Sequence, residues 1–328
     1  MTSPASGPSI AIVGAGLAGA IAAQTLQAHG ARPVVFEKSR GPGGRCATRR
    51  MDEVGFDHGA QYFTVRDPRI KERLPEWLRA GVVAPWQARI VARDNDQWIA
   101  KPQPTRYVGV PGMSALAGAL LQGIETHFDV RVSGLEATAH GWRVRSNVSQ
   151  DGRVFDRVLV TAPPPQASVL LQAAPPLARA ADAVAMAPCW AAMFTFDAPI
   201  EVHFDGAFAN HPNISWLARN NSKPGRPPRE AWVVHASENW SRRHLEVSPE
   251  AVLPELLALF FEISGARPRP ALHRAAHRWR YARPTSALDE PCLVAPEWGL
   301  AVAGDAYTGG RIEGALLSGL LASERLLS

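Results

Sequence analysis

Three glycines, Gly14, Gly16 and Gly19, stand in the spacing G-x-G-x-x-G directly after a short apolar run. In a strand-to-helix turn, the first glycine permits the tight turn and the second lets the backbone approach a pyrophosphate. The third lets the helix lie close to the strand. The N-terminus of that helix offers unpaired N–H groups and the positive end of its dipole to phosphate oxygens. The spacing therefore predicts a binding site for the pyrophosphate of a dinucleotide.

An acidic residue, Glu37, stands at the end of the next apolar run. Its carboxylate could accept hydrogen bonds from both ribose hydroxyls of an adenosine. A G-x-G-x-x-G pattern also arises by chance. Here, however, a strand, a helix and an acidic residue accompany it in the order that dinucleotide binding requires. The combination therefore favours a dinucleotide site over coincidence.

A second glycine-rich turn, RGPGGR, occupies residues 40–45. It resembles the GG motif of flavoproteins in the glutathione-reductase and amine-oxidase group. Such a turn lets the main chain and the Arg45 guanidinium reach the same pyrophosphate from the other side. An arginine-rich surface turn is the alternative interpretation, but a domain that binds only NAD does not need this turn. The second motif therefore indicates FAD rather than NAD.

A third motif, Gly304-Asp305, follows the apolar run 300–303 and precedes the sequence RIEGA at residues 311–315. It resembles the C-terminal motif of FAD proteins, in which the aspartate holds the ribityl chain or the pyrophosphate. A helix that begins near Ile312 would direct the positive end of its dipole at the N1–C2=O edge of the flavin, which gains negative charge on reduction. Three separate motifs in this order predict FAD as the cofactor.

Four stretches make the chain resemble the renalase family, within the wider flavin amine-oxidase group. They are DHGAQYFT at 57–64, PGMS at 111–114, AHRWRYARP at 276–284, and the region 304–319 with its R-x-E-G-A-x-x-S-G pattern. The resemblance covers nearly the whole chain. It implies noncovalent FAD in a two-domain fold like that of p-hydroxybenzoate hydroxylase. It also implies oxidation of the misreduced 2- and 6-dihydro isomers of NAD(P)H to NAD(P)+, with O2 reduced to hydrogen peroxide.

The sequence also departs from other members of the wider group. Cys292 lacks the glycine-rich and tyrosine context in which covalently flavinylated monoamine oxidases place their cysteine, so we expect dissociable FAD. Asp305 is followed by neither the His nor the Pro of aromatic hydroxylases, which disfavours hydroxylation. A disulfide reductase needs a redox cysteine pair, which the three cysteines do not form. Another flavin amine oxidase or desaturase, or a flavin-binding protein without turnover, stays open as an alternative.

Hydride transfer from a dihydronicotinamide leaves an aromatic pyridinium, so no proton has to be removed with it. The enzyme then has mainly to hold the donor carbon against flavin N5, for which aromatic and polar walls suffice. We expect Tyr62, Trp279 and Tyr281 in such a wall. His235 could hydrogen-bond the carboxamide, and Arg283 could meet a ribose or phosphate oxygen. Apart from Tyr62, each has a structural alternative, in the core or in a surface ion pair, and no residue is assigned as a catalytic acid or base.

The residues expected to contact FAD come from the three motifs and from the stretch that ends at Tyr62. With two additions, at positions 38 and 132, the predicted contacts are Gly14, Gly16, Leu17, Ala18, Gly19, Glu37, Lys38, Gly43, Gly44, Arg45, Gly59, Ala60, Gln61, Tyr62, Val132, Gly304, Asp305, Arg311, Ile312, Glu313 and Ala315. No metal site is predicted, because the three cysteines stand in no metal-binding spacing.

These motifs require a βαβ unit at the start of the chain. The sequence predicts it as a strand over 9–13, a helix over 17–29 and a strand over 33–36. The elements predicted further along are a helix over 111–122, an antiparallel meander over 130–161 closed by residues 158–161, a second sheet within 187–247, a surface loop over 220–230, a helix over 253–263 and a buried strand over 300–303 before a C-terminal helix.

The dinucleotide unit occurs at both ends of the chain, and 328 residues exceed what one small core usually supports. We therefore predict an α/β fold in which a Rossmann-like FAD-binding domain, of the p-hydroxybenzoate-hydroxylase or amine-oxidase type, is interrupted by a substrate domain. The substrate domain should contain a mixed sheet and helices. The FAD-binding domain is assigned residues 1–64, 106–165 and 292–328. The substrate domain is assigned residues 65–105 and 166–291.

Composition argues against several other classes of protein. The net charge is +5, but only four of the 35 basic residues are lysine, and the arginines are dispersed. That pattern disfavours nucleic-acid binding. No apolar run has membrane-spanning length and no basic region precedes an apolar stretch at the N-terminus, so we expect neither a membrane span nor a secretory signal. The expected protein is a cytoplasmic enzyme, a monomer or homodimer, whose partners are a dihydronicotinamide dinucleotide and O2.

Overall fold

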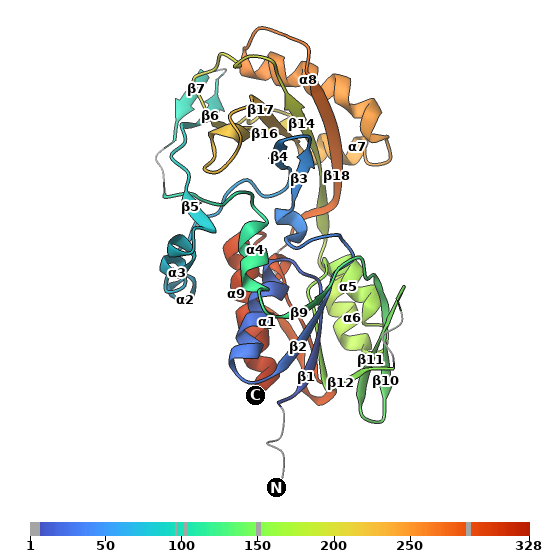
Figure 1. Ribbon diagram of the computed structural model, residues 1–328. Coiled ribbons are helices and arrows are strands. Elements are labelled where there is room, and N and C mark those ends of the chain that lie inside the picture. The colour runs from blue at the N-terminus through green and yellow to red at the C-terminus, as the bar shows by residue number, and fades with distance from the viewer. Residues whose placement is uncertain (1–6, 96, 102–103, 149–151, 287–289) are drawn as a thin grey trace.

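A mostly parallel sheet of six strands forms the lower part of the molecule in Figure 1. The computed structural model describes residues 7–95, 97–101, 104–148, 152–286 and 290–328. All five residues of β1 (Ser9–Val13), a strand in the interior of this sheet, are buried, as expected for a parallel strand that is covered on both faces. In spatial order the strands are β19 (Leu293–Ala295), β20 (Leu300–Val302), β13 (Arg157–Val160), β1 (Ser9–Val13), β2 (Arg32–Phe36) and β9 (Glu125–His127).

Three helices cover one face of this sheet: α1 (Leu17–Ala28), α4 (Ala115–Leu120) and α9 (Ile312–Leu327). Ile10 and Ile12 of β1 belong to the apolar cluster beneath them. Figure 1 shows α1 and α9 side by side, although they stand at opposite ends of the chain. The first glycine motif begins α1, and the third motif lies in the turn between β20 and α9, so the packing of α1 against α9 brings the two motifs to the same end of the sheet.

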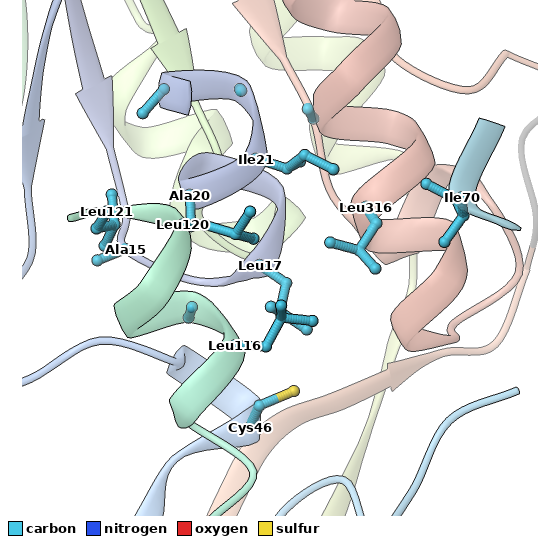
Figure 2. Close-up of a cluster of buried hydrophobic side chains, with 14 of the residues drawn as sticks. Ala15, Leu17, Ala20, Ile21, Cys46, Ile70, Leu116, Leu120, Leu121 and Leu316 are labelled. Carbon is cyan, nitrogen blue, oxygen red and sulfur yellow. The ribbon is translucent and has the colours of Figure 1, made fainter. Parts of the chain in front are cut away.

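The contact between α1 and α9 depends on a glycine. A Cβ at Gly319 would overlap the backbone of Ala18, so only glycine lets the helices approach this closely. Figure 2 shows Leu17 and Ile21 of α1 and Leu316 of α9 in the apolar cluster around this contact. Each such side chain contributes about 1.5–3 kcal/mol when it is fully buried.

The opposite face of the six-stranded sheet carries a small antiparallel sheet and a pair of helices. Their apolar side chains form one cluster with Ala11 and Val13 of β1. These elements are β10 (Val132–Thr138), β11 (Gly141–Ser146), β12 (Val154–Phe155), α5 (Pro164–Leu170) and α6 (Pro175–Asp182).

Two segments differ here from the prediction. Residues 158–161 were expected to close the antiparallel meander, but β13 leaves it and pairs in parallel with β1 and β20. Residues 166–182 were assigned to the substrate domain, but α5 and α6 pack against the six-stranded sheet. The apolar residues of β13 are buried on both faces, which is the pattern of a parallel strand rather than of a half-exposed meander.

A mixed sheet of seven strands forms the upper part of the molecule (Figure 1). Most neighbours in it are antiparallel, and β15 pairs in parallel with β6. In spatial order the strands are β18 (His273–Pro284), β14 (Met186–Thr195), β17 (Ala231–Ala236), β16 (Ile214–Arg219), β15 (Gly206–Phe208), β6 (Ile90–Asp94) and β7 (Gln97–Ala100).

Different elements pack against the two faces of the seven-stranded sheet. On one face, Trp190 and Trp232 pack against α8 (Pro249–Ser264). On the other face, Met193 and Val233 pack against a hairpin of β3 (Thr48–Met51) and β4 (Val54–Asp57). This hairpin directly follows the second glycine turn in the sequence. This hairpin places the segment that follows residue 57 against β17 and β18, because the His58 carbonyl bonds to His235 and Trp279.

Several short elements complete the described chain. They are η1 (Gly44–Cys46), α2 (Pro68–Lys71), α3 (Leu74–Arg79), β5 (Val83–Pro85), which pairs with β8 (Tyr107–Gly109), η2 (Asn220–Ser222), α7 (Glu238–Arg243), η3 (Pro296–Trp298) and η4 (Asp305–Tyr307). Within the described ranges, no helix combines the length and the apolar character that crossing a membrane requires.

The segment 220–230 was expected as a surface loop, but four of its polar side chains are buried. Asn220 and Lys223 are 0% and 2% exposed, and Arg226 and Glu230 are also buried. The expectation was wrong because it weighed the polar composition of the segment and not the partners available to it. These polar groups find buried partners on other parts of the chain, which offsets the cost of removing them from water.

Candidate active site

The first glycine turn has the geometry that its spacing predicts. Gly14 has a φ of +113°, and its N–H donates to the Phe36 carbonyl over 2.8 Å. A Cβ at Gly19 would overlap the carbonyl oxygen of Gly14, so α1 can begin this close to β1 only with glycine there. Gly16, by contrast, has nothing within 4 Å of the position where its Cβ would lie. The turn therefore leaves open space at Gly16, beside the N-terminus of α1.

The second glycine turn lies directly against the first. The Gly43 N–H donates to the Ala15 carbonyl over 2.8 Å, and Gly43 forms an isolated parallel bridge with Gly16. Gly43 and Gly44 have φ values of +113° and +52°, in the left-handed region that favours glycine. The two turns therefore face each other across the space beside Gly16.

The third motif joins this pair through Arg45. Its guanidinium binds both carboxylate oxygens of Asp305, with 3.1 Å between Nη1 and Oδ2, and also donates to the Ala282 carbonyl over 3.2 Å. Gly304 offers open space where its Cβ would lie, and its N–H donates to Ser318 Oγ over 2.8 Å. Three motifs that are far apart in the sequence thus meet at one place, in front of the N-termini of α1 and α9.

Glu37 lies at the end of β2 and is 6% exposed. One of its carboxylate oxygens accepts the Ala15 N–H over 2.8 Å, and the other accepts the Ser39 N–H over 2.8 Å. These bonds hold the carboxylate beside the first glycine turn. Each oxygen has a second lone pair, which leaves acceptor capacity for a ribose hydroxyl.

Other predicted contact residues lie in more varied surroundings. Lys38 is exposed and donates to Gln166 over 3.3 Å, and Val132 is half-buried at the start of β10. Arg311 is exposed at the residue before α9. The Glu313 carboxylate accepts the backbone N–H groups of residues 66 and 67, the latter over 2.7 Å, so in this structure it anchors the chain that follows the DHGAQYFT stretch.

The assembled residues fit an extended dinucleotide such as FAD. Open space at Gly16 and Gly304 is the cradle that a Cβ would fill. Two helix N-termini supply positive charge for a pyrophosphate, and Glu37 supplies acceptors for a ribose. Arg45, expected to reach the pyrophosphate, is paired here with Asp305. Among the described residues, no cluster of His, Cys, Asp and Glu could hold a metal ion.

The segment from Gly59 to Tyr62 is held against the second turn. The Ala60 N–H donates to the Arg45 carbonyl over 3.0 Å, and a Cβ at Gly59 would overlap that same carbonyl oxygen. Gln61 turns back along the segment, and its Nε2 donates to the carbonyls of Asp57 and of Gly59, the latter over 2.9 Å. Tyr62 is half-buried beyond it.

A buried charge cluster, which the sequence analysis did not identify, anchors this segment. One carboxylate oxygen of Asp57 accepts from Lys223 Nζ over 3.1 Å and from Arg226 over 2.6 Å. Lys223 Nζ also donates to Gln61 Oε1 over 3.0 Å. Burial lowers the pKa of Lys223 to about 8. Burial alone would raise the pKa of Asp57, but the charges of Lys223 and Arg226 hold it below its ordinary value.

An aromatic and histidine group lies between the hairpin and the seven-stranded sheet. The His58 carbonyl accepts from Trp279 Nε1 over 3.0 Å and from His235 Nε2 over 3.2 Å. The His58 ring stacks on Trp279 with 5.0 Å between centroids and meets His277 edge-on at 4.8 Å. Burial lowers the pKa of His58 to about 3 and that of His235 to about 4, so both imidazoles are neutral near pH 7.

The two remaining pocket candidates behave differently from each other. Arg283 is exposed and forms an ion pair with Glu238 over 2.7 Å. It is therefore a member of a surface pair in this structure, the structural alternative that the sequence left open. Tyr281 is half-buried on the same strand, β18.

Acid should destabilise the folded chain through its buried imidazoles. The folded-state pKa values of His58 and His235 lie below their ordinary value of 6.5, so the unfolded chain binds more protons between pH 6.5 and about 4. The stability present above pH 6.5 is therefore lost as the pH falls through this range, by up to about 1.4 kcal/mol per pH unit for each histidine.

Denaturant midpoints at pH 7, 6 and 5 would measure this loss. The variant His235→Gln keeps an N–H donor for the His58 carbonyl but does not titrate, so its stability should fall less steeply with acid. Equal slopes for the variant and the native chain would contradict the assignment of His235 as a neutral buried imidazole.

A second aromatic group surrounds Tyr62. Its ring lies 6.2 Å from the ring of Trp86 and 5.7 Å from that of Trp216, between centroids. The Arg106 guanidinium carbon lies 4.9 Å from the centroid of the Tyr62 ring. Lys223 Nζ lies 5.6 Å from the Trp86 centroid, which connects this group to the buried charge cluster. Of these residues the sequence analysis identified only Tyr62.

Comparison with known proteins gives two family matches. A model described as NAD(P)-binding Rossmann-like domain matches residues 12–77. A model described as flavin containing amine oxidoreductase matches residues 86–327, which is well over half of the chain.

Solved structures resemble the chain over almost its full length. A proposed protoporphyrinogen oxidase from Exiguobacterium gives a TM-score of 0.77 at 13% identity, and the match covers 98% of each chain. An oxidoreductase from Methanosarcina mazei gives 0.72 at 14% identity, with 96% of this chain and 100% of that chain covered. A putrescine oxidase variant gives 0.71 at 13% identity, with 98% of each covered. At these identities the likeness concerns the fold, and it confirms the predicted fold class.

Proposed function

This chain belongs to the flavin-containing amine oxidoreductase family and its cofactor is FAD, and on that premise we propose that it is a renalase-like oxidase. Its substrates would be the misreduced 2- and 6-dihydro isomers of NADH or NADPH, and its products NAD(P)+ and hydrogen peroxide. The FAD would be bound noncovalently. The proposal rests on the DHGAQYFT and AHRWRYARP stretches and on the character of the groups beside the flavin site.

The observation that carries the proposal is that the titratable groups around Trp279 are poor proton acceptors near neutral pH. Near neutral pH, His58 and His235 are weak bases, because burial lowers their pKa values to about 3 and about 4. Burial raises the pKa values of the Cys46 and Cys189 thiols to about 12. Burial also lowers the pKa of His277, whose ring meets that of Trp279 edge-on at 4.3 Å, so every imidazole of this group is a weaker base than an ordinary histidine. Oxidation of a dihydronicotinamide needs no base, because a hydride alone leaves the ring.

An alkylamine substrate would place a different demand on the same residues. It reaches the protein mainly as an ammonium ion and must lose a proton before it is oxidised to an imine. Asp57, the buried carboxylate that anchors the Gly59–Tyr62 segment, is already paired with Lys223 and Arg226. The site therefore suits a substrate that is oxidised without deprotonation better than it suits an amine.

When bound, FAD would supply the hydride acceptor and then pass the electrons to O2, which takes up protons to become hydrogen peroxide. The chain's own residues would hold the substrate. Tyr62 and Trp279 offer aromatic surfaces against which a dihydronicotinamide ring can lie. The bonds from His235 and Trp279 to the His58 carbonyl fix that wall, so that substrate is held in one orientation.

Anaerobic mixing of the holoenzyme with a panel of reductants would test the proposal. Borohydride-generated isomers of NADH and NADPH should bleach the flavin absorbance within the first turnover, whereas simple amines should leave it unchanged. Readmission of O2 should restore the absorbance and release hydrogen peroxide.

Other outcomes would point to the alternatives. Bleaching by an amine and not by the dihydronicotinamide isomers would identify a different flavin amine oxidase. A flavin that is reduced but that O2 does not reoxidise would indicate a flavin-binding protein without turnover.

A further inference from the structure

Arg106 is a buried cation without a counter-charge. It is 7% exposed, and its Nε has no hydrogen-bond partner. In the described parts of the chain, its side chain has neither an ion pair nor a hydrogen bond, and its guanidinium lies over the ring of Tyr62. Leaving a buried charge unpaired costs several kcal/mol, so a folded chain that keeps one usually uses it.

A second unpartnered donor lies beside the same ring. Trp216 is 6% exposed, and its Nε1 is buried without a hydrogen-bond partner. Its ring lies 5.7 Å from that of Tyr62. Trp216 and His235 are cross-strand partners in β16 and β17, so the Trp216 side chain lies on the sheet face that meets the His58 segment. Two unsatisfied donors therefore lie near Tyr62.

The partner that these two groups lack must be an acceptor. Neither an arginine nor an indole N–H can accept a hydrogen bond, so a second donor such as an ammonium ion cannot satisfy them. The nearby charge is also net positive. Asp57 is shared by Lys223 and Arg226, which leaves Arg106 uncompensated, and an anion would complete the balance.

We propose that Arg106 and Trp216 form a subsite beside Tyr62 that binds an anionic oxygen group of the substrate, a phosphate or a carboxylate. An arginine fork binds such a group through two N–H donors, and the indole N–H adds a third. The inference deepens the proposed function and rests on it for the identity of the substrate, since a dihydronicotinamide dinucleotide carries phosphates and an alkylamine does not.

Calorimetric titration of the holoenzyme with three aromatic probes tests the subsite without turnover. Phenyl phosphate and benzoate present a phosphate and a carboxylate on the same ring, and benzylamine presents a cation. Wild-type protein should bind at least one anion, and the preferred probe distinguishes phosphate from carboxylate. Benzylamine should not bind. Arg106→Met should weaken anion binding by about 10- to 100-fold, the range expected for a charge-assisted hydrogen-bonded contact.

Three further variants separate binding from folding. Arg106→Lys keeps the charge but not the fork and should weaken binding less than Arg106→Met does. Trp216→Phe keeps the ring and removes the N–H, and should weaken binding by about 3- to 10-fold. Arg280→Met removes an exposed arginine that pairs with Glu246 and should change nothing. Because Arg106→Met removes an unpaired buried charge, it should raise the thermal midpoint of the holoenzyme while it weakens binding.

The anion-binding subsite and the proposed function can fail independently in these experiments. Anion binding that is unchanged in Arg106→Met and Trp216→Phe, or tighter binding of benzylamine than of either anion, would overturn the subsite even if dihydronicotinamide isomers are oxidised. Anion binding that depends on Arg106 would uphold the subsite even if those isomers fail to reduce the flavin. If Arg106→Met does not fold, Arg106→Lys and Trp216→Phe decide the question.

Discussion

Replacing Asp57 by asparagine is expected to lower the free energy of unfolding by about 3–5 kcal/mol, because it strands two buried cations. Lys223 and Arg226 reach the same carboxylate oxygen over 3.1 and 2.6 Å, and the side chains of all three residues are at most 1% exposed. Removing one side of a buried ion pair costs far more than the pair contributes as a whole. The measurement is the denaturant midpoint, followed by tryptophan fluorescence at a fixed FAD concentration.

Two further variants show whether the loss comes from the stranded charge. Lys223→Met in the Asp57→Asn background removes one of the two unpaired cations, so part of the lost stability should return. Glu246→Gln breaks an exposed pair with Arg280 and should leave the midpoint unchanged. If Asp57→Asn and Glu246→Gln shifted the midpoint equally, the cluster could not be the anchor of the Gly59–Tyr62 segment.

The glycine turns could be predicted from the sequence because their requirements are local. Gly14 and Gly19 are five residues apart, and the overlap that forbids a Cβ at Gly19 is with Gly14 itself. Glu37 bonds to Ala15 within the same βαβ unit. Short-range geometry of this kind requires a fixed spacing of residues, which can be recognised in the sequence. The start of α9 at Ile312 could be predicted for the same reason, because an apolar strand, a turn and a helix follow one another there.

The buried charge cluster could not be predicted in the same way. Asp57 is separated from Lys223 by more than half the chain, and the pairing follows from how the β3–β4 hairpin packs on β17. A polar loop rich in Pro and Arg normally lies in solvent, so composition pointed to the surface. The one local signal was that a chain with four lysines places one of them in this otherwise arginine-rich loop.

Strand β13 and the helices α5 and α6 were assigned to the wrong sheet or domain for a related reason. The sequence RVLV of β13 is a nearly continuous apolar run, which favours a strand in a parallel sheet over one in a meander. Its partners, β1 and β20, lie far away in both directions along the chain. A domain boundary was placed at residue 165, but Pro164 begins a helix that crosses this position, and proline is well tolerated at the start of a helix.

A side chain introduced at Gly16 is expected to have the second large effect. Replacing Gly16 by valine should lower the affinity for FAD by about 10- to 100-fold, or ~1.4–2.8 kcal/mol, while the protein without FAD keeps its stability. The reason is that nothing in the protein lies within 4 Å of the new Cβ, and Gly16 has an extended backbone with a φ of −73°, which valine adopts readily. The side chain would instead occupy the place where the backbone must approach the pyrophosphate. Titration of the apoprotein with FAD, followed by flavin fluorescence, measures the effect.

Substitutions at two other glycines serve as controls for this result. Gly118→Ala in α4 meets only Pro42, at 3.8 Å, and should leave both FAD affinity and stability of the apoprotein intact or slightly improved. Gly19→Ala overlaps the Gly14 carbonyl and should damage the fold itself, so FAD affinity and apoprotein stability should fall together. Gly16→Val is the variant in which the two quantities should separate. If it bound FAD as tightly as the native chain, the space between the three glycine turns could not be where the dinucleotide lies.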